Sequence, residues 1–312
     1  MSAVRYSTTL GPDLRQNRAS GDIPAHSCYF FESYRKSSFW VFAASMKCVL
    51  TIAGFDPSSG AGVTADLMVF AAHGLFGTSC ITGLTVQSTV GVLATHPVDA
   101  KIVRETLNCL QDDMPAAGIK IGMLGTAGIV AAVADFLAKL RVRGSLIPVV
   151  LDPVLRSSSG RELLDDEGMV LMRERLLPLV NWVTPNLDEL GRLCGRPVSR
   201  REKVPGAART LQQGITRLNV LATGGDLDKP DDCVVTAAGE VRWLAGEKIA
   251  SRSTHGTGCA LSSALLSRLV LGDSDFEAAL GAKKYVAEAI RRAKPMGRGK
   301  GPLDHLWPLR DK

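Results

Sequence analysis

The sequence predicts an α/β fold with a central, mostly parallel sheet and helices on both of its faces. Two observations support this. Apolar runs of strand length alternate with helical patterns over about 250 residues, as βα repeats require. Several of these runs are apolar throughout, which is typical of parallel strands buried on both faces. Since no repeat or low-complexity linker interrupts the pattern, residues 46–312 are predicted to form a single domain.

The predicted elements follow each other in a regular order. Strands are expected over residues 47–53, 78–88, 119–124, 146–153, 182–186 and 219–225, and a hairpin over 234–243. Helices are expected over residues 62–74, 129–140, 259–272 and 275–293. The first helix is supported by Gly74, which suits a helix C-terminus, and the last by Ser274 and Glu277, which have the spacing of a capping box.

The first 45 residues differ from the rest of the chain. They are rich in Ser and Arg and show no sustained hydrophobic period, so we expect a loosely ordered extension over residues 1–45. Its carboxylates and its lack of an apolar segment argue against a targeting peptide. Met46 is a candidate start of the chain, since the first clear strand follows it directly.

Composition narrows the classes of partner. The net charge of +6 is spread along the chain and aromatic residues make up 5%, which argues against nucleic acid and weakly favours anionic ligands. No uncharged apolar run approaches the roughly 18–20 residues that span a bilayer, so no membrane partner is expected. The seven cysteines have no CxxC spacing, so neither zinc nor a disulfide framework is expected, and a reducing cytoplasm fits best.

In open α/β sheets, ligands bind beyond the carboxyl ends of the strands, and the first glycine-rich turn at such an end covers residues 53–66. Gly60, Gly62 and Ala65 match a dinucleotide fingerprint, but the loop is longer than that motif and no acidic ribose partner follows. A Walker A loop is excluded because no Lys-Ser or Lys-Thr follows the glycines. Either the turn lets a helix pack on a strand, or Asp56 and the serines after it form a polar edge over a small substrate.

The second glycine-rich turn, over residues 252–265, precedes a strongly apolar helix. Backbone N–H groups at a helix N-terminus bind anions, and Gly256 and Gly258 around Thr257 leave room for a phosphoryl group to reach them. Cys259 falls in the first turn of this helix. Such a cysteine can have a lowered pKa and act as a nucleophile or proton acceptor, although most single cysteines are small buried hydrophobic residues.

Other polar residues end predicted strands. Asp152 is placed to help hold a metal. Asn186 is a natural helix N-cap, and Glu189 one turn later could hold Mg²⁺ through water. The amide of Gln87 suits the edge of a heteroaromatic ring, or is an ordinary polar group at a strand end. Met123 is judged by residue type to be a core residue. Together these parts predict phosphoryl transfer, which needs positioned anion-binding groups and Mg²⁺.

The sequence resembles the hydroxymethylpyrimidine/phosphomethylpyrimidine kinases of thiamine biosynthesis, which are part of the ribokinase-like superfamily. The similarity covers nearly all of residues 48–307. The motifs that carry it are TIAGFDPSSGAGVTADL, TGLTVQSTVGV, IKIGML, VLDPV, VTPNLDEL, THGTGCALSSAL and GRGKGPLDHL.

This resemblance implies a ribokinase-like fold and two successive ATP-dependent phosphorylations, first of an aminopyrimidine alcohol and then of its monophosphate. Gln87 would bind the aminopyrimidine edge, and the ring would be lined by Gly54, Asp56 and Met123. The transferred phosphoryl group would be stabilised by Gly256, Thr257 and Gly258. Cys259 stands where other ribokinase-like enzymes have an aspartate base, and would act on the hydroxymethyl oxygen.

The resemblance also implies a Mg·ATP site and a homodimer, which is common in such families. Asn186 and Glu189 would organise Mg·ATP with help from Asp152, and the nucleotide phosphates would be contacted by Thr223, Gly224 and Gly225. Some relatives have a lysine where this chain has Thr223. Arg156 or Lys300 could supply the missing charge.

Three alternatives remain at this point. A pyridoxal kinase would act on a similar flat alcohol and shares the cysteine-type turn. A catalytically inactive ligand-binding regulator on the same scaffold is suggested by the missing lysine. A nicotinamide oxidoreductase rests only on the spacing of Gly60, Gly62 and Ala65.

Overall fold

The computed structural model describes residues 46–157, 160–225, 227 and 229–310. They belong to a compact unit assigned to Met46–Lys312. The extension predicted over residues 1–45 lies outside the described residues, so its loose order stays a prediction. No helix in the described part of the chain is long and apolar enough to cross a membrane.

A single sheet organises the described residues, with the strand order β3-β2-β1-β4-β5-β6-β7-β8-β9. From β2 to β7 all neighbours are parallel, while β3, β8 and β9 pair antiparallel at the two edges. The predicted mostly parallel sheet is therefore confirmed. The strands are β1 (Cys48–Phe55), β2 (Phe76–Ser88), β3 (Gly91–Pro97), β4 (Ile119–Ile121), β5 (Val149–Leu151), β6 (Trp182–Val183), β7 (Asn219–Ala222), β8 (Asp232–Val235) and β9 (Val241–Leu244).

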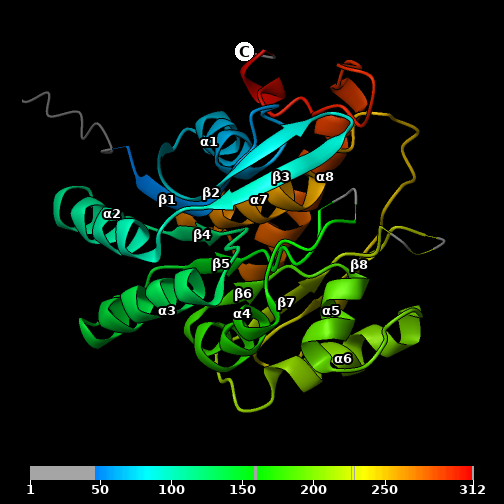
Figure 1. The fold of residues 1–312 in the computed structure, drawn as a ribbon. Helices are drawn as coiled ribbons and strands as arrows, with labels where there is room; N and C mark the ends of the chain where they lie inside the picture. The colour runs from blue at the N-terminus through cyan, green and yellow to red at the C-terminus, as the bar shows by residue number, and fades with distance from the viewer. Residues whose placement is uncertain (1–45, 158–159, 226, 228, 311–312) are drawn as a thin grey trace, which may run out of the picture. The chain divides into compact units, whose positions relative to one another are not determined.

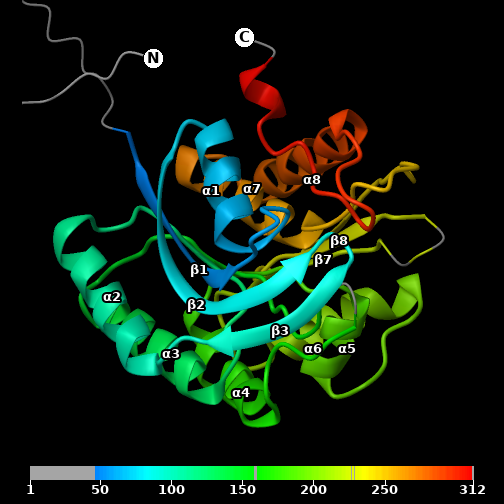
Figure 2. The same ribbon diagram turned by 45° about the horizontal axis from the view of Figure 1, so that its top comes forward.

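Helices cover both faces of the sheet, as Figures 1 and 2 show. One face carries α1 (Gly62–Ala72), α7 (Thr257–Leu271) and α8 (Asp275–Arg292). The other carries α2 (Ala100–Asp113), α3 (Ala127–Val142), α4 (Asp166–Leu171), α5 (Leu187–Cys194) and α6 (Val204–Gln212). Short 3-10 or π turns cover Met172–Leu176, Leu177–Leu179, Arg201–Lys203 and Trp307–Leu309.

Successive side chains of the central strands point into two separate cores. Leu50 and Ile52 of β1 pack into the core under α2 to α6, while Val49 packs into the core under α1, α7 and α8. In β5, Val149 packs into the first of these cores and Val150 into the second. This alternation follows from the two-residue period of a strand, and it explains why these strands are apolar throughout.

Most local signals were interpreted correctly, but strand β3 and helices α2, α4 and α6 were not predicted, and α5 was indicated only by its N-cap Asn186. The capping box of Ser274 and Glu277 begins α8, as predicted. The predicted hairpin is β8–β9, with Gly239 at a φ of 87° in its turn. Helix α2 was missed although its sequence is amphipathic, with Val103 and Leu107 on its buried side. Strand β3 was missed because it is a partly exposed edge strand.

Candidate active site

A cavity of about 810 Å³ opens where β1, β4, β5 and β6 end, beside the β2–β3 hairpin. This is the edge at which open α/β sheets bind ligands. The cavity brings together all the predicted site residues except Gly224 and Gly225. They are Gly54, Asp56, Gln87, Met123, Asp152, Asn186, Glu189, Thr223, Gly256, Thr257, Gly258 and Cys259.

A second hollow of about 1230 Å³ runs along α8 and the β7–β8 connection. Gly225 lines this hollow, and Thr223, Thr257 and Gly258 line both cavities. The glycine-rich turn before α7 therefore forms part of the boundary between two spaces.

The boundary turn can bind an anion through its backbone. Gly256 has a left-handed φ of 83°, and a Cβ at this position would collide with the carbonyl oxygen of Gly60. No side chain of the described residues caps α7, so its first-turn N–H groups face the cavity without such a partner. A Cβ built on Gly258 would lie 3.7 Å from Asp152 Oδ2, which places that carboxylate directly beside the turn.

Asp56 is buried and holds the first glycine-rich loop in place. Its carboxylate accepts hydrogen bonds from the Ser58 amide (2.8 Å), the Ser58 hydroxyl (2.7 Å), the Ala61 amide (3.0 Å) and His255 Nε2 (2.7 Å). Burial alone would raise the pKa of Asp56, but the bonds from His255 and Ser58 outweigh it and lower the pKa. Asp56 therefore lines the cavity as an ionised, fully engaged group.

His255 connects the two glycine-rich segments, and sequence reasoning assigned it no role. Its Nε2 lies 2.7 Å from Asp56 Oδ2 and 2.9 Å from the amide nitrogen position of Gln87. An ionised carboxylate only accepts, so Nε2 must carry the proton. The Gln87 amide is therefore oriented with its oxygen toward His255. Its nitrogen then lies 3.2 Å from the Thr85 hydroxyl oxygen and donates to it.

Met123 lines the cavity against Gly54. A Cβ on Gly54 would collide with the terminal methyl of Met123, so the Met123 side chain packs directly against the Gly54 backbone. The interpretation of Met123 as a pure core residue is therefore incomplete, because it also lines the cavity.

Cys259 is partly exposed to the cavity. Its pKa is raised to about 12, because burial favours the neutral thiol more strongly than the nearby Lys120 charge favours the thiolate. The predicted lowering of this pKa is therefore wrong. The thiol donates to Asp152, which lowers the pKa of that carboxyl, but burial raises it more, to about 6.

Lys120 is a fully buried cation beneath the site that sequence reasoning missed. Its Nζ lies 2.9 Å from Asp66 Oδ2, and both side chains are completely shielded from solvent. Asp66 also accepts from the hydroxyls of Thr51 (2.6 Å) and Ser263 (2.7 Å). Burial would lower the pKa of Lys120, but Asp66, Cys259 and Asp152 together raise it. A signal was present, since Lys120 and Asp66 each interrupt an apolar run.

Asp152 and Glu189 form a pair of buried carboxyl groups at the floor of the cavity. Burial and the charge of Asp152 raise the pKa of Glu189 to about 8, although the Asn186 and Leu155 amides donate to it. Asn186 caps α5 as predicted, accepting from the Glu189 amide (2.9 Å). Two mutually repelling oxygen donors fit Mg²⁺, which binds few protein ligands when phosphates supply the rest. The described residues contain no larger cluster of metal-binding side chains.

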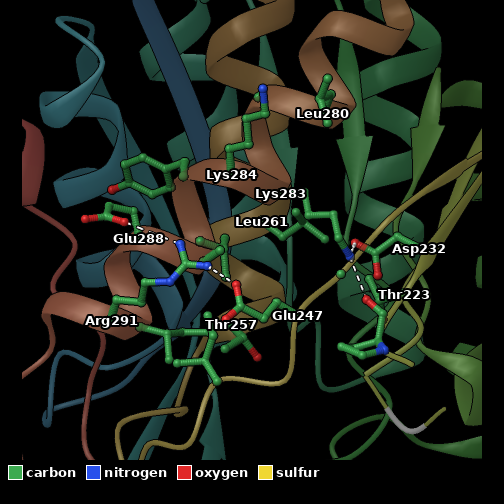
Figure 3. A pocket seen from close by; sticks show the side chains of 18 of the residues that line it. Thr223, Asp232, Glu247, Thr257, Leu261, Leu280, Lys283, Lys284, Glu288 and Arg291 are labelled. Carbon is green, nitrogen blue, oxygen red and sulfur yellow. Dashed lines mark hydrogen bonds and ion pairs between the residues drawn. The ribbon is translucent and has the colours of Figure 1, made fainter. Parts of the chain in front are cut away.

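The 1230 Å³ side of the boundary carries Lys283, which was not among the predicted substitutes for the missing lysine. Lys283 of α8 lies 2.8 Å from Asp232 Oδ2, and Asp232 Oδ1 accepts from the Gly224 amide (3.0 Å). Figure 3 shows Lys283 pointing toward Asp232 in this hollow. The two predicted substitutes for the missing lysine, Arg156 and Lys300, line the other cavity.

A parallel sheet with a glycine-rich helix start between two cavities is the arrangement of the ribokinase-like kinases. The sequence model of the phosphomethylpyrimidine kinase family matches residues 56–304, and the chain belongs to this family.

Two relatives illustrate the similarity in sequence. The chain is 40% identical over 265 residues to the thiamine biosynthesis bifunctional protein ThiED of Geobacter sulfurreducens, covering 84% of this chain and 53% of that protein. It therefore spans about half the length of that relative. It is 37% identical over 266 residues to the hydroxymethylpyrimidine/phosphomethylpyrimidine kinase of Haemophilus influenzae, covering 84% of this chain and 97% of that protein.

Solved structures show the same fold. A phosphomethylpyrimidine kinase from Clostridium difficile superposes with a TM-score of 0.69 and 33% identity, covering 78% of this chain and 99% of that one. A pyridoxal kinase from Bacillus subtilis, in an ADP complex, superposes with a TM-score of 0.75 and 29% identity, covering 86% and 100%.

Proposed function

We propose that the chain uses ATP to phosphorylate 4-amino-5-hydroxymethyl-2-methylpyrimidine and then phosphorylates the monophosphate to the diphosphate, for thiamine diphosphate synthesis. Family membership supports this proposal. The observation that carries it is that Thr257 and Gly258 line both cavities. A donor along α8 and an acceptor beside Gln87 would meet at backbone groups suited to the charge of a phosphoryl group in transfer.

The acceptor ring would lie between the β2 end and the first glycine-rich loop. Gln87 would bind the aminopyrimidine edge, because an amide offers a donor and an acceptor together. Asp56 holds His255, and His255 in turn contacts Gln87. These two residues would position Gln87 and would not hydrogen-bond to the ring themselves. Gly54 and Met123 would form the apolar wall.

In the first step the hydroxymethyl oxygen attacks the γ-phosphorus of ATP. The new O–P bond forms as the bond from the γ-phosphorus to the bridging oxygen breaks, and that electron pair leaves on ADP. Because Cys259 rests as a thiol, we propose that it works as a relay. Its sulfur accepts the hydroxyl proton while its own proton passes to Asp152, to which it donates a hydrogen bond.

Asp152 and Glu189 would hold Mg²⁺ through its bound water, with Asn186 fixing the start of α5 beside them. The ion would neutralise charge on the donor phosphates. Binding through water leaves an oxygen of Asp152 able to take part in the relay. Thr223, Gly224 and Gly225 would contact the nucleotide phosphates.

The proposal is tested by incubating the protein with ATP, Mg²⁺ and the aminopyrimidine alcohol, and counting monophosphate and diphosphate over time. Pyridoxal is assayed in parallel, because a pyridoxal kinase shares the fold at a TM-score of 0.75. A clear preference for pyridoxal would replace the pyrimidine assignment. No turnover of either alcohol, with binding retained, would identify a ligand-binding regulator.

We also propose a homodimer in a reducing, cytoplasmic setting. The β2–β3 hairpin exposes the apolar side chains Leu84, Val86, Val90 and Leu93, which a second copy could cover. All six cysteines in the described residues are free thiols, as expected in a reducing compartment. Light scattering on the wild type and on Leu93→Glu tests the dimer. A monomeric wild type would end that part of the proposal.

A further inference from the structure

Three cations lie along the mouth of the 810 Å³ cavity, and the proposed first phosphorylation assigns them no step. Arg252, Arg298 and Lys300 all line this cavity and are exposed. Among the described residues, none of the three forms an ion pair with a carboxylate. Arg156 lines the same cavity but is already paired with Glu162 at 2.5 Å. We call Arg252, Arg298 and Lys300 the basic mouth.

The glycines of the GRGKG segment fix two of these cations in place. A Cβ on Gly297 would collide with the Thr89 side chain, and a Cβ on Gly299 would collide with the Thr89 carbonyl oxygen. The Gly299 amide donates to the Thr89 hydroxyl at 3.3 Å. The two glycines therefore pack against the tip of the β2–β3 hairpin. Arg298, which lies between them, and Lys300, which follows Gly299, line the cavity.

The same segment is joined to the boundary turn. The Gly301 amide donates to the Arg252 carbonyl (3.0 Å), and the His255 amide donates to the Gly301 carbonyl (3.0 Å). His255 directly precedes Gly256, and Lys300 directly precedes Gly301. Lys300 is therefore separated from Gly256 only by Gly301, one backbone hydrogen bond and His255, so the basic mouth adjoins the anion-binding turn.

We propose that Arg298 and Lys300 form a subsite for the phosphate of the monophosphorylated pyrimidine during the second phosphorylation. This rests on the proposed function. The monoester carries about −1.5 to −2 charge at pH 7 and must approach the γ-phosphoryl group of ATP, which is also anionic. Two unpaired cations beside the acceptor phosphate offset that repulsion, and Arg252 supports the segment by donating to the Arg298 carbonyl (2.8 Å).

The second step balances without a general base. An ionised oxygen of the monoester attacks the γ-phosphorus, and the bond from that phosphorus to the bridging oxygen breaks with its electron pair leaving on ADP. No proton is displaced. The cations bind and position the acceptor and carry no bond change themselves. The uncharged alcohol of the first step does not need them.

The test compares the two acceptors in the double variant Arg298→Met/Lys300→Met of the full chain. We expect kcat/KM for the monophosphate to fall at least tenfold, mainly through KM, while kcat/KM for the alcohol stays within about twofold. The salt dependence of the monophosphate reaction should also weaken, because fewer charges attract the dianion. The matched control is Arg104→Met/Lys139→Met, which removes two exposed cations that line neither cavity.

Equal losses with both acceptors would overturn the subsite, because the segment would then act on folding or on the nucleotide. Unchanged monophosphate kinetics would overturn it as well. Titration of the monophosphate without ATP gives an independent readout, and the variant should bind it at least tenfold more weakly than the wild type. If the wild type phosphorylates neither acceptor, the proposed function itself fails, which is a different result from either of these.

Discussion

Replacing Cys259 with Ala should separate the two phosphorylations. The alcohol of the first step must lose a proton, and Cys259 with Asp152 is the relay beside the boundary turn. The monoester oxygen of the second step is already ionised above its second pKa of about 6, so it needs no base. Removal of the thiol should therefore impair only the step in which a proton moves.

The expected size follows from the chemistry. A positioned proton acceptor contributes about 10²–10⁴-fold, which is about 3–5 kcal/mol of barrier at about 1.36 kcal/mol per decade. For Cys259→Ala we expect a loss of that size in kcat for the alcohol, and a change within about threefold for the monophosphate. The fold should persist, because the side chain is small and partly exposed.

The assay supplies each acceptor separately with saturating Mg·ATP and resolves the products by ion-exchange chromatography. Thermal unfolding of the variant serves as the control for folding. Equal losses in both steps would refute the relay, and would mean that Cys259 shapes the anion-binding turn. Full activity in both steps would mean that the thiol only packs there and that the backbone acts alone.

Four further predictions concern the surrounding residues. Gln87→Leu should raise KM for the pyrimidine by a factor that corresponds to about 1–3 kcal/mol, since a buried ring edge loses its partner; an unchanged KM would remove Gln87 from the site. Glu189→Gln should raise the melting temperature at pH 8 without Mg²⁺, yet raise the Mg²⁺ concentration needed for activity. The direction of the stability change follows from the pKa of Glu189, which is about 8 in the folded state and 4.5 ordinarily. Because the folded pKa is the higher one, the wild type loses stability as pH rises between these two values. Asp56→Asn should cost about 1–3 kcal/mol of unfolding free energy at pH 7 and less near pH 3. The pKa of Asp56 is below 3.8 in the folded state, so its contribution to stability is complete above pH 3.8 and is lost on acidification. The same difference between variant and wild type at both pH values in denaturant melts would contradict this. Lys120→Met should destabilise by about 3–5 kcal/mol because it leaves Asp66 buried and unpaired, and Lys120→Met/Asp66→Leu should recover stability while alcohol phosphorylation stays impaired; recovery of both would make the ion pair purely structural.

The sequence predicted the parts of the fold whose causes are local. Strands buried on both faces are apolar throughout, so the parallel core could be predicted, as could the N-cap Asn186 and the capping box of Ser274 and Glu277. That Glu189 completes a capping box with Asn186 was not predicted. Candidate site residues were found because polar groups after parallel strands must meet at one edge of the sheet.

What the sequence could not predict depends on distant partners. His255 gains its role from Asp56, 199 positions away, and from Gln87, 168 positions away. The position of Cys259 in the first turn of a helix allowed for a lowered pKa, although a buried neutral thiol was the alternative. Here burial outweighs both the effect of the helix start and the Lys120 charge.

The lysine missing at Thr223 shows how the position of a charge decides which phosphate it can serve. Arg156 and Lys300 were both candidates to replace it, yet they line the 810 Å³ cavity, whereas the cations that line the 1230 Å³ hollow are Arg268, Lys283, Lys284, Arg291 and Arg292. Lys283 is neutralised by Asp232, so it holds the Gly224 loop and adds little net charge for ATP. Lys284, which also lines that hollow, forms no ion pair with a carboxylate among the described residues, so positive charge is available on both sides of the boundary turn. Under the proposed function the distinctive charges are Arg298 and Lys300, which would serve an acceptor that is itself a phosphate and add little for a neutral alcohol.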